Sequence, residues 1–467
     1  MHAALELTYT PELWIGSLGY AGATEAMGYD GDGLLTKAGA FTIGRDSGNG
    51  LPKTVSDGTF RLTRGFNGHG EIESLESTVG GSGVSVSLTR NPDGRIARKS
   101  ETVAGASHIL NYTYDGLGRL RTVTRDSVLV EEYRYDANGN RTYQMNLDLG
   151  ITGRQFTHSV EDHTLTAGPI TFEFDQDDRI AARIEGSQTT EYAYATTGEL
   201  LGVRLPDGTE YAYIHDPLGR RIAKLVNGVI VERYLWSGPT TLLAVYDGSN
   251  RLVQRFRYAD GRMPFAMDMG AATYYLHYDQ VGSLRLVTAS SGAVVKRIDY
   301  DSFGTILADS NPAFAVPFGF AGGLHDRDTQ LVRFGVRDYL PEIGKWTAKD
   351  PIGFDGGDSN LFGYVSNDPV NFSDPEGLRI FGTGKLLGWA TKWAAKKIGG
   401  KIGEKLGEAA GIFNPEIAHP DEQKEMDQDT DGDGSNDFFD DDDDNDGIPD
   451  RNDPDPKKPH SNSDKCN

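Results

Sequence analysis

Residues 112–120 read Tyr-Thr-Tyr-Asp-Gly-Leu-Gly-Arg-Leu, and variants of this stretch recur along most of the chain. Further copies are Tyr-Arg-Tyr-Asp-Ala-Asn-Gly-Asn-Arg at 133–141, Tyr-Asp-Gln-Val-Gly-Ser-Leu at 278–284 and Tyr-Asp-Ser-Phe-Gly at 300–304. The aromatic residue that marks each unit lies at positions 114, 135, 156, 174, 194, 213, 234, 258, 278 and 300, in steps of 18 to 24 residues. Such regularity is typical of repeat proteins, in which each unit is one structural module.

Each unit reads as a β-hairpin. Alternating aromatic and polar residues favour a strand, and the Asp-x-x-Gly that follows favours a turn. The Asp side chain can accept hydrogen bonds from backbone amides two residues on, and Gly accepts a positive φ. The composition agrees, since 59 Gly and 21 Tyr accompany only 37% hydrophobic residues. We therefore expect an all-β body of stacked hairpins that bury one aromatic face.

These Tyr-Asp units resemble the RHS/YD-repeat family, which includes bacterial RHS proteins, the C components of Tc toxins and teneurins. The resemblance spans about residues 10–378. It implies a spiral of β-hairpins that forms a shell or partial shell, which in bacteria encloses the C-terminal region of the same chain. We divide this part into a YD-repeat shell, 1–273, and a core region, 274–378. An ordinary β-solenoid or propeller without cargo is the structural alternative.

The core region carries an ordered series of motifs. It includes Tyr-Tyr-Leu-His-Tyr-Asp at 274–279, Phe-Gly-Phe-Ala-Gly at 318–322, Arg-Asp-Tyr-Leu-Pro at 337–341 and Asp-Pro-Glu-Gly-Leu at 374–378. The series resembles the RHS-associated core, which in toxins is a self-cleaving aspartyl protease. The resemblance implies a cut between Leu378 and Arg379, with Asp350 and Asp374 as the carboxylate pair and Arg337 beside them.

These residue types suit that chemistry. One ionised carboxylate can activate a water while its protonated partner donates a proton to the scissile carbonyl, because two close acids do not both ionise. The alternative is that the Asp-Pro pairs only form turns. Enzyme activity is therefore left open, and it would act on this chain alone. We assign Asp338 and Asp355 to structural roles.

The composition changes abruptly after Leu378. Residues 379–412 carry seven Lys or Arg against two Glu, and apolar residues recur every four positions. This pattern predicts a cationic, glycine-rich helical segment over 379–420. With Trp389 and Trp393, residues 385–411 suit a membrane surface, while packing as cargo inside the shell is the alternative.

The last segment, 421–467, is an acidic tail. From 421 to 455 it carries 17 Asp or Glu against 2 Lys or Arg, out of a net charge of -23. Two loops with carboxylates at positions 1, 3, 5, 9 and 12 and Gly at 6 predict calcium (Ca²⁺) binding. They resemble thrombospondin type 3 repeats, and a disordered acidic tail is the alternative. The predicted ligands are Asp429, Asp431, Asp433, Asp437, Asp440, Asp442, Asp444, Asp446, Asp450 and Asp453.

Together these features predict an exported RHS-type shell protein, part of a bacterial toxin or contact-dependent system, which cleaves itself after Leu378. The rival function is a non-enzymatic cell-surface adhesin or glycan-binding stalk with a calcium-binding tail. Calcium sites favour a secreted or cell-surface location. The expected partners are the chain's own C-terminal segment as cargo and an upstream shell segment or partner subunit. Nucleic acid is disfavoured because the body lacks a basic face.

Overall fold

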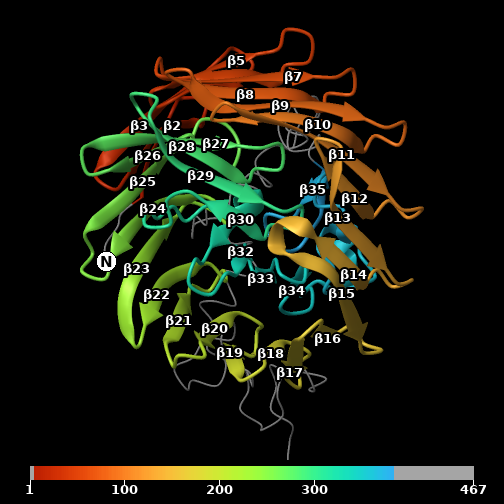
Figure 1. Ribbon diagram of the computed structural model, residues 1–467. Helices are drawn as coiled ribbons and strands as arrows, with labels where there is room; N and C mark the ends of the chain where they lie inside the picture. The colour runs from red at the N-terminus through yellow and green to blue at the C-terminus, as the bar shows by residue number, and fades with distance from the viewer. Residues whose placement is uncertain (1–4, 383–467) are drawn as a thin grey trace, which may run out of the picture. The chain divides into compact units, whose positions relative to one another are not determined.

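The computed structural model describes residues 5–382, which are almost entirely β-strands and turns and contain no α-helix (Figure 1). Thirty strands make one sheet in which each strand pairs antiparallel with the next along the chain. The strands are β1 (Glu6–Tyr9), β2 (Ile15–Tyr20), β3 (Ala23–Tyr29), β4 (Leu35–Ala38), β5 (Phe41–Arg45), β6 (Pro52–Ser56), β7 (Phe60–Phe66), β8 (Ile72–Val79), β9 (Ser82–Arg90), β10 (Ile96–Val103), β11 (Ala106–Tyr114), β12 (Leu120–Arg125), β13 (Val128–Tyr135), β14 (Arg141–Asn146), β15 (Ile151–His158), β16 (Thr164–Ala167), β17 (Ile170–Phe174), β18 (Ile180–Glu185), β19 (Gln188–Tyr194), β20 (Leu200–Arg204), β21 (Glu210–His215), β22 (Arg221–Val226), β23 (Val229–Trp236), β24 (Leu242–Asp247), β25 (Leu252–Arg257), β26 (Ala266–Met269), β27 (Ala272–Tyr278), β28 (Leu284–Ala289), β29 (Val294–Tyr300) and β30 (Ile306–Asp309). The predicted all-β fold of successive hairpins is thus confirmed.

Shorter elements follow the large sheet. A four-stranded sheet contains β31 (Leu324–His325), β32 (Val332–Phe334), β33 (Arg337–Leu340) and β34 (Lys345–Trp346), and a two-stranded sheet contains β35 (Phe372–Ser373) and β36 (Phe381–Gly382). Within residues 5–382 there are also four 3₁₀ turns: η1 (Leu147–Leu149) lies between β14 and β15, and η2 (Phe320–Gly322), η3 (Gly353–Gly356) and η4 (Val365–Asn367) follow the large sheet.

The turn of each YD unit forms as the sequence predicts. Oδ1 of Asp115 accepts hydrogen bonds from the backbone nitrogens of Leu117 at 2.9 Å and Arg119 at 3.0 Å. Gly118 has a φ of 82°, a backbone angle that residues other than glycine rarely adopt. The aspartate therefore replaces backbone hydrogen bonds that the tight turn cannot make, and this chemistry ends β11 and starts β12.

The aromatic residue of several units has a structural role of its own. The hydroxyl of Tyr135, at the end of β13, donates to the carbonyl oxygen of Leu120, the first residue of β12, at 2.9 Å. Tyr114 makes the same bond to Ile96 at 2.7 Å. The equivalent donors Trp236 and Tyr258 bond Arg221 and Leu242, the first residues of β22 and β24. The side chain thus fastens the end of one strand to the beginning of the previous one.

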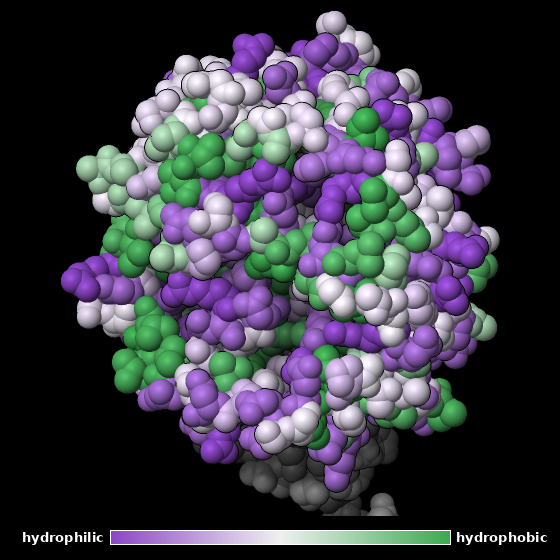
Figure 2. Space-filling view, viewed as in Figure 1, coloured by the Kyte–Doolittle hydropathy of each residue, from purple (hydrophilic) through white to green (hydrophobic). Residues whose placement is uncertain are grey.

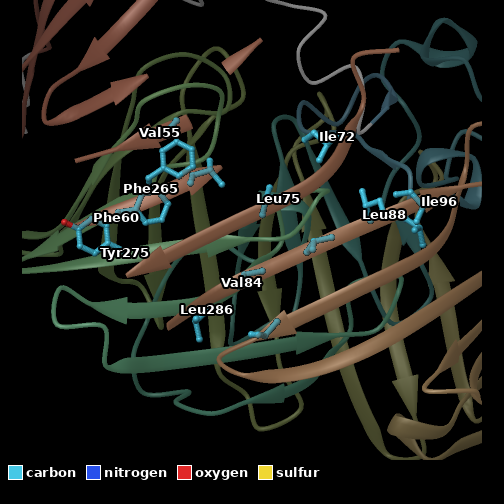
Figure 3. Packing of buried hydrophobic residues seen from close by; sticks show 14 of the residues in the cluster. Val55, Phe60, Ile72, Leu75, Val84, Leu88, Ile96, Phe265, Tyr275 and Leu286 are labelled. Carbon is cyan, nitrogen blue, oxygen red and sulfur yellow. The ribbon is translucent and has the colours of Figure 1, made fainter. Parts of the chain in front are cut away.

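The sheet returns on itself, because β8 and β9 lie beside β27 and β28 (Figure 1). Phe60 stacks on Tyr275 with ring centroids 5.7 Å apart, within an apolar cluster drawn from both segments (Figure 3). In the same interface, Nδ1 of His277 lies 2.9 Å from Oγ of Ser77. Burial of apolar area on both faces stabilises this contact between segments about 200 residues apart in sequence.

Residues 310–382, the described part of the chain after β30, contain an inner segment within the band of strands, where Figure 1 places β32–β34. Leu331, Leu340 and Ile343 from this inner segment pack into the apolar cluster of β15–β21. The hydroxyl of Tyr339 donates to the carbonyl oxygen of Phe303 at 2.7 Å, and the amide of Asn367 donates to that of Gly139 at 2.9 Å. The inner segment is therefore fixed to several separate hairpins.

The outer face in Figure 2 carries apolar residues in small patches scattered among polar ones. Two exposed leucines, Leu117 and Leu218, lie at the tips of YD turns, 71% and 56% exposed. Among the residues that the structure describes, no helix is long and apolar enough to cross a membrane.

Two predicted boundaries fall within the described residues. The sheet continues across the predicted division at 273/274, because β27 spans it and the last strand of the sheet ends at Asp309. At the start of the segment predicted as helical, 379–420, Phe381 and Gly382 pair with Ser373 and Phe372 as β36. The rest of that segment, 383–420, and the calcium tail, 421–467, lie outside the described residues.

Candidate active site

Arg337, on β33, joins the two carboxylates that the sequence pairs with it. Its Nη2 atom lies 2.8 Å from Oδ2 of Asp350 and 3.2 Å from Oδ2 of Asp374. Its Nε atom donates to the carbonyl oxygen of Gly377 at 2.5 Å, and the guanidinium lies over the Trp346 ring at 4.1 Å. The arginine thus bridges both acids through one nitrogen.

Close backbone packing brings these residues together. Gly335 precedes β33 with a φ of 48°, and a Cβ atom there would lie 2.1 Å from the carbonyl oxygen of Glu376. A Cβ atom on Gly377 would lie 2.5 Å from the carbonyl oxygen of Phe334. Because neither position has room for a side chain, glycine is what lets the loop 374–378 lie against the start of β33.

The peptide bond predicted to be cleaved, between Leu378 and Arg379, is hydrogen-bonded to the side chain of Asp374. Its Oδ1 atom accepts hydrogen bonds from the backbone nitrogens of Leu378 and Arg379, each at 3.0 Å. The Arg379 nitrogen is the one that would leave on cleavage between these residues. A Cβ atom on Gly356 would lie 2.7 Å from Oδ2 of Asp350 and 3.1 Å from the carbonyl oxygen of Leu378. Asp350 and the carbonyl oxygen of the same peptide therefore both border Gly356.

A small cleft borders this peptide. Its wall contains the three site residues and Leu378 and Arg379, together with Gly353, Gly356, Asp358, Asn360, Leu361, Gly363, Val365 and Ile380. The volume within the cleft that the centre of a water-sized sphere can occupy is about 10 Å³. This is close to the minimum that one water molecule occupies. The cleft can therefore hold the water that hydrolysis requires.

Burial dominates the electrostatics of the site. It raises the pKa of Asp374 to about 6, against the opposing effects of Arg337 and of the two backbone N–H donors. Burial also raises the pKa of Asp350 above its usual value, again opposed by Arg337. The pKa of Arg337 itself is lowered by burial, although both carboxylates favour its charge. At least one acid can therefore hold a proton close to neutral pH.

The structure also places the acids that we assigned to structural roles. Asp338, the next residue on β33, accepts from Arg221 at 3.0 Å and from Arg333 at 2.6 Å, so it belongs to a separate buried ion-pair group. Asp355 is exposed in η3. Sequence reasoning missed Gly356 and Asp358, which line the cleft; the Gly-Phe-Asp-Gly-Gly-Asp run at 353–358 was the available signal.

Within residues 5–382, no group of three or more His, Cys, Asp or Glu side chains could hold a metal ion. The ten predicted calcium ligands, Asp429 to Asp453, lie outside this range, so their binding stays a prediction.

Comparison with solved structures supports the fold. A TcdB2-TccC3-Cdc42 crystal structure superimposes with a TM-score of 0.66 at 16% identity, covering 84% of this chain and 22% of that chain. A Photorhabdus luminescens Tc holotoxin pore gives a TM-score of 0.63 at 16% identity, with 80% and 21% covered. Identity this low shows a shared fold alone.

Sequence comparison shows the family. Teneurin-3 of Danio rerio is 27% identical over 69% of this chain, and Teneurin-1 of Gallus gallus is 31% identical over 56%. The tRNA3(Ser)-specific nuclease WapA of Bacillus spizizenii is 24% identical over 58%. The chain spans only 10–12% of the length of these relatives. The similarity to teneurins agrees with the predicted secreted or cell-surface location of this chain. Since the family model of the teneurin YD-shell matches residues 16–370, the chain belongs to the teneurin YD-shell family.

Proposed function

We propose that this YD shell belongs to an exported toxin or contact-dependent system and cleaves its own chain after Leu378. The observation that carries the proposal is the pair of hydrogen bonds from Leu378 and Arg379 to Asp374, which fixes the scissile nitrogen against a buried acid. Asp350 and the Leu378 carbonyl oxygen both border Gly356, and Asp350 and Leu378 line the same water-sized space.

In this reaction, ionised Asp350 takes a proton from the water in the cleft, and the water oxygen bonds to the Leu378 carbonyl carbon. The Arg337 guanidinium keeps Asp350 ionised, because the salt bridge at 2.8 Å favours the charged form. Protonated Asp374 then gives its proton to the Arg379 nitrogen as the C–N bond breaks. The products are a carboxyl group on Leu378 and an amine on Arg379, so atoms and protons balance.

The cleaved C-terminal segment is the proposed cargo. In this proposal, strands from another polypeptide or from an upstream segment complete the shell that retains the cargo. The Tc structures that share the fold name a second protein component, and their chains are longer than this one. We therefore include an upstream shell segment or a partner subunit in the proposal. The acidic tail would bind calcium through its ten aspartates, and residues 385–411 would contact a membrane surface after release.

The deciding experiment is to purify the full chain under denaturing conditions and to measure its mass and the N-termini present. Self-cleavage produces a second N-terminus at Arg379 and a C-terminus at Leu378. A chain that stays intact after complete folding would refute self-cleavage and favour the non-enzymatic adhesin.

A further inference from the structure

A second cavity lies where several YD turns meet the inner segment. Its lining residues include Trp236, Pro375 and four arginines, Arg220, Arg221, Arg262 and Arg333, and we call it the arginine pocket. Four of these lining residues are arginines, and none carries a carboxylate. The volume within the pocket that the centre of a water-sized sphere can occupy is about 30 Å³, which is clearly more than one water molecule needs.

The carboxylates that contact these arginines do not balance their charge. Asp338 accepts from both Arg221 and Arg333, and Asp216 pairs with Arg220 at 2.6 Å. Two carboxylates thus contact three of the four guanidinium groups, and none in the described part of the chain contacts that of Arg262.

Arg262 differs from the other three. Within residues 5–382 its oxygen partners are backbone carbonyls alone, those of Ala321 at 2.6 Å and Val281 at 3.3 Å. A charged group placed in a confined site without a counter-ion is costly, unless an anion can enter.

The arginines also keep unused hydrogen-bond donors. The Nε atoms of Arg221, Arg262 and Arg333 are buried and have no partner among the described residues. Arg221 and Arg333 are only 2% and 4% exposed, so bulk water does not satisfy these donors. Buried donors are normally paired, and their clustering around one cavity indicates a ligand with several acceptor oxygens.

A neighbouring group responds to the positive charge of the pocket. The pKa of His215 is lowered to about 4, first by burial and then by Arg333 and Arg221. The pKa of Arg262 is lowered to about 10 by burial, and the charge of Asp374 opposes this shift. The His215 shift agrees with an excess of positive charge, and the Arg262 shift reflects the cost of burying a guanidinium group.

We infer that the arginine pocket binds a small tetrahedral oxyanion, of the class of phosphate and sulfate. Guanidinium groups from separate segments can each give a planar pair of donors to such an ion. The space has room for a few heavy atoms, which favours a free ion. Pro375 forms one wall, so the ion would lie against the loop that contains Asp374, although this inference does not rest on self-cleavage.

The test is a calorimetric titration of the full chain with inorganic phosphate, at an ionic strength held constant with chloride. A second titration uses sulfate, and a third uses acetate, a carboxylate. We expect saturable binding of one phosphate per chain, with sulfate competing and acetate at least tenfold weaker. Arg262→Gln and Arg220→Gln should each weaken phosphate binding at least tenfold. The titration measures phosphate binding itself. Its result can therefore be interpreted whether the chain is intact or has been cut after Leu378.

Arg251→Gln is the matched control. Arg251 pairs with Asp247 at 2.7 Å in the turn position that Arg220 has with Asp216, but its side chain is 81% exposed and outside the pocket. It should leave phosphate binding unchanged. Absence of saturable phosphate binding, tighter binding of acetate than of phosphate, or equal affinity in all three variants would overturn the inference. If Arg262→Gln fails to fold, Arg220→Gln decides, because its ion pair is partly exposed.

Discussion

The backbone nitrogen of Arg379 donates to Oδ1 of Asp374 at 3.0 Å, so the amide expected to break is hydrogen-bonded to a buried carboxyl group. Replacing Asp374 with Asn keeps an oxygen acceptor at this place and removes the acid. We expect Asp374→Asn, and likewise Asp350→Asn, to slow cleavage after Leu378 by about 100-fold or more, the usual contribution of a general acid or base. Denatured mass spectrometry over time measures the rate.

Asp355→Asn is the control for these variants, because Asp355 is exposed in the neighbouring 3₁₀ turn. It should cleave at the wild-type rate. Cleavage of Asp374→Asn at the wild-type rate would exclude Asp374 as the proton donor.

The pH dependence of cleavage follows from the raised pKa of Asp374, about 6. If the protonated form is the donor, the rate should fall as the pH rises through about 6. It should also fall at lower pH, as Asp350 becomes protonated. Cell-free synthesis at a series of pH values from about 5 to 8, with the cut fraction followed over time, measures this profile. A rate that rises steadily towards pH 8 would reverse the proposed roles.

The tyrosine hydrogen bonds between strands should stabilise the shell individually. Tyr135→Phe removes the donor to the Leu120 carbonyl and leaves that oxygen without its partner. We expect a loss of about 1 kcal/mol in the free energy of unfolding. Urea denaturation measures it, and Tyr9→Phe, at a 55% exposed position, should have no effect. An equal loss in both variants would show that the bond itself contributes nothing.

A buried acid pair links β13 to the turn after β29. Glu131, 4% exposed, accepts from Tyr133 and from the Ser302 backbone, while Asp301 accepts from Asn146. Burial raises the pKa of both carboxyl groups. For raised pKa values, the stabilising contribution is complete below the unfolded-state pKa and is lost as the pH rises through the folded-state pKa.

The wild-type melting temperature should therefore fall relative to Glu131→Gln as the pH rises from about 5 to 8. Glutamine keeps an acceptor for Tyr133 and carries no charge at any pH. Glu132→Gln, the next residue on β13, is the control and should parallel the wild type. Melting curves of Glu131→Gln that run parallel to the wild type across this range would contradict the assignment.

Calcium should protect the tail from proteolysis while the shell stays unchanged. Asp433→Asn and Asp446→Asn each remove a carboxylate from position 5 of one predicted loop, and we expect them to weaken calcium binding. Asp455→Asn lies beyond both loops and is the control. Equal digestion of residues 421–467 with millimolar calcium and with chelator would refute the calcium prediction.

Part of this molecule follows directly from its sequence. The Asp-x-x-Gly turn acts through contacts within five residues, so Asp115 and Gly118 predict it locally. The bond from Tyr135 to Leu120 could not be predicted, because it depends on the register of two strands and a bulge next to the tyrosine. The grouping of Arg337, Asp350 and Asp374 came from family resemblance. The arginine pocket draws residues from positions 220 to 375, which no local pattern connects.

The pairing of β35 with β36 changes what a cut after Leu378 would accomplish. Phe381 and Gly382 are held to Ser373 and Phe372 by strand pairing, and Ile380 packs on the apolar cluster around Tyr364. After a cut between Leu378 and Arg379, the new N-terminus at Arg379 would still be held to the shell by these contacts of residues 380–382. The two polypeptides would then travel as one particle, and their separation would be a second event with its own trigger.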